Sequence, residues 1–228
     1  GEIVYIENDE LKSLKPFPKR KKRPCVFEYI YFSRPDSLID GVTAYEYRKK
    51  LGSELSKEDN INADLIVPVP DSGNAAALGY SQNKNIRFDL GLIRNHYVGR
   101  TFIEPAQKIR SLGVKLKLNA NKSSIKNKII VLVDDSLVRG TTSYKIVNML
   151  YEAGAKEVHL RIASPEIKFP DFYGIDMPSK KELLAANMSV EEICNYVKAK
   201  SLKFLSLNGL YKAMGFEKRN NDYPQLTD

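Results

Sequence analysis

The stretch that most constrains the fold is an apolar run that ends in two carboxylates and then passes through a glycine. Residues 129–133 read Ile-Ile-Val-Leu-Val, Asp134 and Asp135 follow, and Gly140 precedes three hydroxyl side chains. A strand that is apolar on both faces is typical of a buried strand in a parallel sheet. This stretch therefore predicts a strand, a short loop and a helix, which is the repeating unit of α/β proteins.

The same alternation recurs along the chain. Continuous apolar or β-branched runs predict strands, and amphipathic stretches predict helices. The expected strands cover residues 3–6, 26–32, 65–69, 128–133 and 157–163, and the expected helices cover 45–55, 75–80, 142–153, 190–199 and 209–214. Ser189 and Asn208 stand where helix caps are expected. The predicted fold is a central parallel sheet flanked by helices, with a long flexible loop and C-terminal helices.

Composition places the chain among ordinary globular proteins. It has 228 residues, of which 43% are hydrophobic and 28% charged. We expect one domain over residues 25–228, preceded by a strand and a basic linker in residues 1–24. No apolar run approaches the roughly 18 residues that a membrane span needs, so we expect no membrane association. Two cysteines without a metal-binding spacing fit a reducing, cytoplasmic location.

The charge indicates an anionic partner without identifying it. Lys and Arg number 36 against 28 for Asp and Glu, a net charge of +8. Residues 19–23 are five consecutive cations between prolines, which predicts an extended, solvated linker. A nucleic-acid patch is the alternative for this linker, although we expect no nucleic-acid partner.

The end of the strand at 129–133 has the chemistry of a ribose-phosphate site. The first turn of a helix offers N–H groups and a positive dipole to phosphate, and Thr141, Thr142 and Ser143 add hydroxyl donors. Asp134 and Asp135 suit sugar hydroxyls or a hard cation such as Mg²⁺. The spacing is neither that of a nucleoside-triphosphate loop nor that of a dinucleotide-binding turn. An acidic strand end beside an ordinary helix cap, with nothing bound, is the alternative.

A long segment between residues 91 and 126 carries many cations and no clear period. A connection of this length predicts a lid or a binding loop, and edge strands covering one end of the sheet are the alternative.

Residues 131–142, Val-Leu-Val-Asp-Asp-Ser-Leu-Val-Arg-Gly-Thr-Thr, resemble the phosphoribosyl-pyrophosphate (PRPP) motif of type I phosphoribosyltransferases, in the form found in the glutamine PRPP amidotransferases. The resemblance covers essentially the whole chain. It also rests on residues 25–37, 67–73, 95–103 and 172–177.

The resemblance implies a role for each matching residue. The PRPP-binding residues would be Asp71, Ser72, Gly73, Asn74, Asp134, Asp135, Ser136, Val138, Arg139, Gly140, Thr141, Thr142 and Ser143. Ser72, Asp134 and Asp135 would lie at the Mg²⁺ ion. Arg94, Tyr97 and Arg100 would be catalytic residues on a loop that closes over PRPP, although exposed loop charges without a role are the alternative.

The implied activity is the formation of 5-phosphoribosylamine and pyrophosphate from PRPP and ammonia, the first step of purine biosynthesis. Purine mononucleotides would inhibit, a glutaminase domain or subunit would supply ammonia, and a homo-oligomer is expected. The alternatives are a PRPP-binding regulator, which would need a DNA-binding segment, and a purine-salvage phosphoribosyltransferase.

The chain departs from the family at two places. It begins at Gly1 where family members carry a glutaminase half, so we expect no glutamine hydrolysis. Some members hold an iron–sulfur cluster on four cysteines, but here Asp171 occupies one ligand position and Cys25 stands alone. We expect no cluster, and we expect Cys194 to be a packed thiol.

Overall fold

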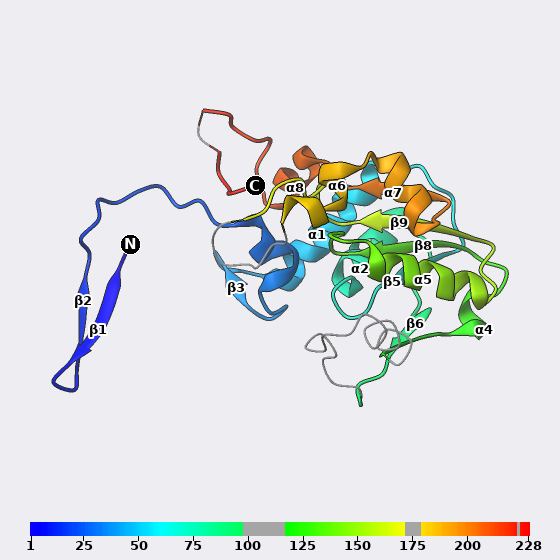
Figure 1. Cartoon of the computed structure of the whole chain (residues 1–228), viewed down its shortest axis with the longest axis horizontal. Coiled ribbons are helices and arrows are strands. Elements are labelled where there is room, and N and C mark those ends of the chain that lie inside the picture. The colour runs from blue at the N-terminus through cyan, green and yellow to red at the C-terminus, as the bar shows by residue number, and fades with distance from the viewer. Residues whose placement is uncertain (98–116, 172–178, 223) are drawn as a thin grey trace. The chain divides into compact units, whose positions relative to one another are not determined.

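The computed structural model describes residues 1–97, 117–171, 179–222 and 224–228 (Figure 1). The chain divides into two compact units, one made of residues 1–26 and 220–228 and the other of residues 27–219. No described helix is long and apolar enough to cross a membrane. The expected boundary between residues 24 and 25 stays a prediction.

The smaller unit contains an antiparallel hairpin. Strands β1 (Ile3–Glu7) and β2 (Glu10–Leu14) pair, with Ile3 opposite Leu14. The turn places Asn8 and Asp9 at positive φ, a conformation that Asn and Asp tolerate better than most residues. The strand expected at residues 3–6 is confirmed. Residues 15–24 form neither helix nor strand, as the prolines and clustered cations predict.

The larger unit is built on a parallel four-stranded sheet in the order β10-β9-β8-β5. These strands are β5 (Leu65–Pro68), β8 (Ile129–Asp134), β9 (Glu157–Ile162) and β10 (Ser201–Phe204). Ile66 pairs with Val131, which in turn pairs with His159. A single bridge from Ile66 to Phe88 adds a short parallel neighbour beyond β5. The strands expected at 65–69, 128–133 and 157–163 are confirmed.

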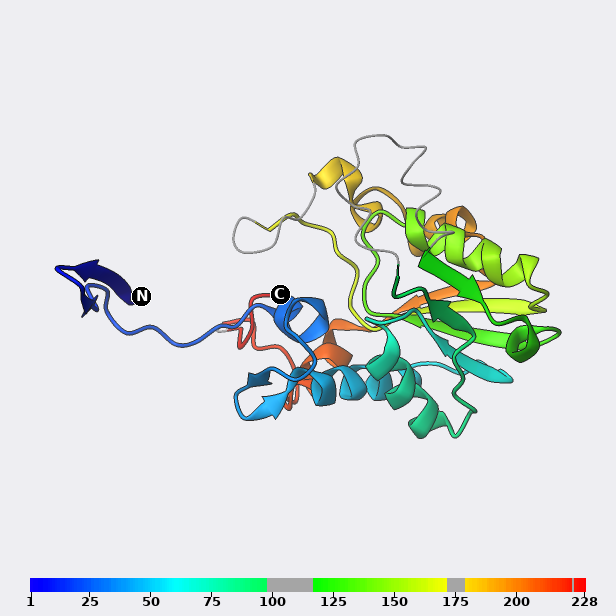
Figure 2. The ribbon, with the colours of Figure 1, turned by 90° about the horizontal axis from the view of Figure 1, so that it is seen from below.

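Helices cover both faces of this sheet (Figure 2). Helices α5 (Thr141–Glu152) and α7 (Val190–Val197) lie on one face, and α1 (Ala44–Lys57) and α2 (Asn74–Lys84) lie on the other. The predicted α/β architecture is therefore confirmed. Successive side chains of a strand point to opposite faces of the sheet, so each strand contributes side chains to both helical layers.

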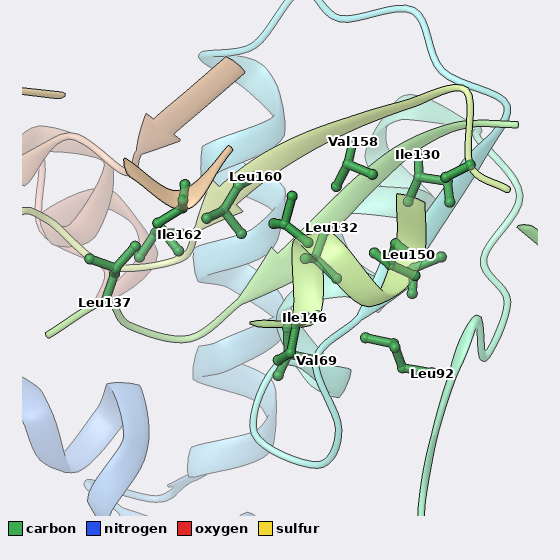
Figure 3. Packing of buried hydrophobic residues seen from close by; sticks show 14 of the residues in the cluster. Val69, Leu92, Ile130, Leu132, Leu137, Ile146, Leu150, Val158, Leu160 and Ile162 are labelled. Carbon is green, nitrogen blue, oxygen red and sulfur yellow. The ribbon is translucent and has the colours of Figure 1, made fainter. Parts of the chain in front are cut away.

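Apolar side chains pack between the sheet and α5 (Figure 3). Leu132 and Leu160 from adjacent strands are fully buried against Ile146 and Leu150 of α5. The opposite face of β9 carries His159 and Arg161, which are also buried. The face toward α1 and α2 therefore contains charged groups that need partners.

Short elements complete the larger unit. They are the π-helical turn η1 (Glu28–Phe32), β3 (Leu38–Ile39), β4 (Val42–Thr43), β6 (Leu92–Arg94), β7 (Leu118–Ala120), α4 (Lys122–Ile125), η2 (Lys180–Glu182), α6 (Leu184–Asn187) and α8 (Leu207–Ala213). Strands β6 and β7 pair with each other. The segment between residues 91 and 126 thus contains a two-stranded antiparallel sheet that is separate from the central sheet, and its residues 98–116 lie outside the described structure.

Two local predictions were wrong. The strand expected at residues 26–32 is the helical turn η1, in which the adjacent residues Tyr29 and Ile30 are both buried. A short aromatic run fits a strand or a buried helical turn equally well by pattern alone. The cap of α8 is Ser206, whose hydroxyl accepts from the Gly209 N–H, rather than Asn208.

Candidate active site

The loops that follow β5 and β8 meet at the carboxyl edge of the sheet. The Val69 N–H donates to the Val133 carbonyl at 2.8 Å. A Cβ atom on Gly73 would lie 2.4 Å from the same carbonyl oxygen. Only glycine permits this approach without a shift of the backbone, so the loop at 69–73 packs directly on the end of β8. The two loops predicted to bind PRPP are therefore neighbours.

Two adjacent carboxylates are buried at the end of β8. Asp134 and Asp135 are 7% and 6% exposed. The Asp135 N–H donates to Asp134 Oδ1 at 2.9 Å, and the Ser136 hydroxyl donates to Asp135 Oδ2 at 3.1 Å. Burial, and next the charge of Asp135, raise the pKa of Asp134 well above its ordinary value. Such a pair is stabilised by a cation or by hydroxyl donors brought by a ligand.

Helix α5 begins at Gly140 without a side-chain cap. Gly140 has a φ of +69°, a left-handed conformation that favours glycine. Thr141 and Thr142 are exposed and Ser143 is buried in the first turn, which contains no acidic residue. The first N–H groups of a helix have no partner within the helix, so this turn presents donors and a positive dipole.

Helix α2 begins in the same way at the end of β5. Its N-cap is Gly73, again without a side-chain cap, and Asn74 starts the helix. Among the described helices of seven or more residues, α1, α7 and α8 are capped by the hydroxyls of Thr43, Ser189 and Ser206. The uncapped starts thus belong to the two helices that follow the neighbouring strands β5 and β8. Both starts suit anionic groups.

The pyrophosphate loop predicted at residues 71–74 contains a buried acceptor without a partner. Asn74 Oδ1 has no hydrogen-bond partner among the described residues. Asp71 is exposed and Ser72 is half-buried. A buried amide oxygen costs free energy unless it accepts a hydrogen bond or binds a cation, so this atom also indicates a ligand site.

The predicted catalytic residues divide between the described and undescribed parts of the chain. Arg94, at the end of β6, forms an ion pair with Asp71 through its Nη1 atom. Tyr97 is fully exposed. Arg100 lies outside the described residues. Arg94 therefore connects the β6–β7 pair to the loop that starts α2.

The remaining predicted residues line the loop between β8 and α5. Ser136 and Val138 are half-buried, and Arg139 is exposed with its Nε 3.1 Å from Glu182 Oε1. The Val138 carbonyl accepts from the Leu184 N–H at 3.0 Å. Segment 180–187 therefore lies against this loop.

Arg48 is a buried cation that the sequence patterns did not indicate. This α1 side chain is 5% exposed and donates to the carbonyls of Tyr29, at 3.0 Å, and Ser33, at 2.6 Å. Burial lowers the pKa of Arg48, and the charge of Asp135 acts in the opposite direction. Arg48 thus holds the segment at residues 29–33 against helix α1. The only available signal was an arginine on the apolar face of a helix.

The residues at this edge fit a magnesium ion held jointly with a ligand. Within the described residues there is no group of three or more His, Cys, Asp or Glu side chains that could hold a metal. Mg²⁺ is commonly bound by one or two carboxylates together with substrate phosphates and water. The buried pair Asp134 and Asp135, with Ser72 on the neighbouring loop, matches that pattern.

The cysteines do not contribute to this site. Cys194 is half-buried, and its thiol donates to the Ala199 carbonyl at 3.3 Å. Burial raises the pKa of Cys194, which disfavours the reactive thiolate. Cys25 is also half-buried and unoxidised.

Comparison with known proteins agrees with this geometry. No family model matches the chain. It is 55% identical, over its whole length, to an amidophosphoribosyltransferase of Rhizobium etli and 50% identical over 94% of its length to that of Methanocaldococcus jannaschii. It covers 47% and 49% of these proteins, so the chain spans about half the length of the curated relatives it matches.

Comparison with solved structures finds similarity to the same kind of protein. A structure described as glutamine PRPP amidotransferase from B. subtilis, complexed with ADP and GMP, is 48% identical. It superposes with a TM-score of 0.84 over 97% of this chain and 49% of that protein.

Proposed function

We propose that this chain, which belongs with the C-terminal phosphoribosyltransferase part of the amidophosphoribosyltransferases, transfers the phosphoribosyl group of PRPP to ammonia. The product would be 5-phosphoribosylamine, and its formation is the first step of purine biosynthesis. One observation carries the proposal. Two helices without side-chain caps begin at the ends of the adjacent strands β5 and β8, beside two buried carboxylates.

The two helix starts would hold the two anionic ends of PRPP. The first turn of α5, with Thr141, Thr142 and Ser143, would bind the 5′-phosphate. The loop at 71–74 and the start of α2 would bind the pyrophosphate. Asp134 and Asp135 lie at the end of β8 and would accept hydrogen bonds from the ribose hydroxyls.

Magnesium would bind between these groups. Asp134, Asp135 and Ser72 would hold it together with pyrophosphate oxygens, and it would neutralise charge that builds on the leaving group. The raised pKa of Asp134 and the unpartnered Asn74 Oδ1 support a bound cation or donor here.

The reaction would be a displacement at C1 of the ribose. The lone pair of ammonia forms the new N–C1 bond, the bond from C1 to the pyrophosphate oxygen breaks, and the nitrogen loses a proton to solvent. Negative charge grows on pyrophosphate as this bond breaks. Arg94 and Arg100 would stabilise that charge, and the loop that carries Arg100 and Tyr97 would keep water from C1.

Purine mononucleotides would compete with PRPP. The B. subtilis relative is described as a complex with ADP and GMP. A nucleoside monophosphate carries the same ribose 5′-phosphate that the start of α5 would bind. Inhibition that is purely non-competitive toward PRPP would contradict a shared site.

The direct test is product formation without glutamine. Pyrophosphate release from PRPP in the presence of Mg²⁺ is measured with ammonium chloride, with glutamine alone and with neither. Only unprotonated ammonia has the attacking lone pair, so the rate should rise with pH in proportion to free ammonia. We expect glutamine alone to be inert, because a glutaminase domain or subunit would supply the ammonia.

Two results would contradict the proposal. The first is a rate that does not depend on ammonium, and the second is a faster reaction with adenine, guanine or hypoxanthine, which would indicate purine salvage. Glutamine-dependent phosphoribosylamine formation by this chain alone would show that the nitrogen source is assigned wrongly.

A further inference from the structure

The loop that enters α5 is supported from outside by the segment η2–α6. The Leu184 N–H donates to the Val138 carbonyl at 3.0 Å, two residues before Gly140. This segment is itself closed into a compact turn. The Asn187 side-chain amide donates to the Leu183 carbonyl at 2.7 Å and to the Lys180 carbonyl at 2.8 Å. Leu183 is fully buried and anchors the turn to the core.

The side chain of Leu184 lies directly against Gly140. A Cβ atom on Gly140 would lie 2.4 Å from Leu184 Cδ1 and 3.2 Å from Tyr196 Cε1. The glycine is therefore required twice, by its positive φ and by these two side chains. Leu184 also packs on the apolar core that includes α5. It thus connects the turn at Gly140 to a rigid part of the molecule.

We propose that Leu184, assisted by Tyr196, is a positioning residue that fixes the turn at Gly140 so that the first N–H groups of α5 face the 5′-phosphate. This inference rests on the proposed function. The N–H donors of a helix start bind an anion well only when their directions are fixed, and a loop that is loose by about 1 Å loses affinity. Leu184 itself does not touch the substrate.

The nearby ion pair does not account for the same effect. Arg139 and Glu182 have side chains that are 56% and 50% exposed. Exposed pairs are screened by water and contribute little to fixing a loop. The apolar contact and the backbone hydrogen bond of Leu184 are therefore the effective support.

The support is specific to one end of the substrate. The start of α2, which would bind pyrophosphate, is held by different contacts, since Gly73 packs on Val133 and its N–H donates to the Val69 carbonyl at 2.8 Å. A change at Leu184 should therefore weaken binding of a 5′-phosphate and leave pyrophosphate binding unaffected. A general loss of stability would weaken both.

Calorimetric titration of the whole chain tests this selectivity, with ribose 5-phosphate and magnesium pyrophosphate as separate probes. In Leu184→Ala, we expect the dissociation constant of ribose 5-phosphate to rise about five- to tenfold and that of pyrophosphate to change less than about twofold. Leu184→Met keeps the bulk and should restore binding to within about twofold of the parent. Tyr196→Leu should weaken ribose 5-phosphate binding by a smaller factor, and it provides a second variant if Leu184→Ala folds poorly.

Leu202→Ala is the matched control. Leu202 is also a partly buried leucine packed on the same core, but it lies on β10. It should affect both ligands by less than about twofold. Unchanged ribose 5-phosphate affinity in Leu184→Ala, or equal weakening of both ligands, would overturn the inference. Failure of the parent chain to bind either ligand would instead contradict the proposed function.

Discussion

Arg161 and Asp59, which are 102 residues apart in sequence, form an ion pair that is almost completely buried. Arg161 is 2% exposed on β9, and Asp59 is 4% exposed just after α1. The Tyr80 hydroxyl also donates to Asp59 Oδ2, at 2.6 Å, and the guanidinium donates to the Ser201 hydroxyl at 3.0 Å. The pair therefore joins the helical layer of α1 and α2 to the edge of the sheet at β10.

This network predicts how stability depends on pH. Burial alone would raise the pKa of Asp59, but hydrogen bonds from Arg161 and Tyr80 outweigh it and lower the pKa below its ordinary value. The stabilisation is therefore present above the pKa of the unfolded carboxyl and is lost as the pH falls through the folded value. Asp59→Asn should cost about 3–5 kcal/mol in the free energy of unfolding at neutral pH, because Arg161 would stay buried without a counterion.

Urea unfolding at a series of pH values checks this prediction. The difference between Asp59→Asn and the parent should shrink below about pH 4, where the parent carboxyl begins to take up a proton. Asp36→Asn is the control, because Asp36 pairs with Arg34 on the surface and should have little effect. A difference that stays constant down to pH 3 would show that the charge of Asp59 is not what stabilises the fold.

Arg48 should be required for both stability and binding. Arg48→Met leaves the carbonyls of Tyr29 and Ser33 without a donor and removes the cation that acts on Asp135. We expect a loss of about 2–4 kcal/mol in the free energy of unfolding, together with weaker ribose 5-phosphate binding. Arg48→Lys keeps the charge but cannot reproduce both hydrogen bonds, so its loss should be smaller.

The control for Arg48 is Lys57→Met on the same helix, whose cation is half-exposed and pairs with Glu54. It should change neither quantity appreciably. If Arg48→Met unfolded at the same urea concentration as Lys57→Met, the guanidinium would not be holding the segment at residues 29–33.

Asp135→Asn should abolish most binding of PRPP and Mg²⁺ while the fold remains. The change removes an anionic ligand from a strand end and keeps the shape of the side chain. The core beside it is formed by other residues, so circular dichroism and the unfolding midpoint should stay close to those of the parent. Calorimetric titration that gave equal PRPP affinity in both proteins would show that the carboxylate is not part of the site.

Arg94→Gln should separate catalysis from stability. The ion pair with Asp71 has half-exposed partners, so its loss should change the free energy of unfolding by less than about 0.5 kcal/mol. The rate of pyrophosphate release should fall, by about tenfold or more, because the cation that would meet the leaving group is gone. Steady-state kinetics with saturating ammonium measures this effect. Lys84→Gln or a similar distant cation would not reproduce it.

The sequence predicted the parallel layers and the two site loops because their signals are local. A buried strand, a glycine and a hydroxyl-rich helix start are all encoded within residues 129–143, and Gly73 similarly marks the turn after β5. These loops meet because parallel strands end at one edge, which is a general property of the fold. The family resemblance adds a prediction of which anions these loops would bind.

The features that the sequence did not predict depend on contacts between residues far apart in the chain. Residues 26–32 read as a strand, yet Glu28–Phe32 form a helical turn in which the Tyr29 carbonyl accepts a hydrogen bond from Arg48. Strand β10 is too short for a clear alternation, and it exists because Ser201 and Phe204 pair with β9. Leu184 and Gly140 are 44 positions apart, and no periodicity connects them. Tertiary packing therefore decided these features, against or beyond the local pattern.

The hydrogen bond from Val69 to Val133 fixes a distance as well as a contact. It joins the ends of two adjacent strands, which lie about 4.8 Å apart in a sheet, so the two loops that leave these strand ends start from a fixed separation. Two anion-binding loops at a fixed separation favour a ligand whose two negative groups are the same distance apart. A compound with both groups at that separation gains from the second contact at no further cost in translational freedom, as a bivalent ligand does. Either group alone must bind with its own affinity, so a breakdown product that keeps one phosphate end should leave the protein far more readily than the intact substrate.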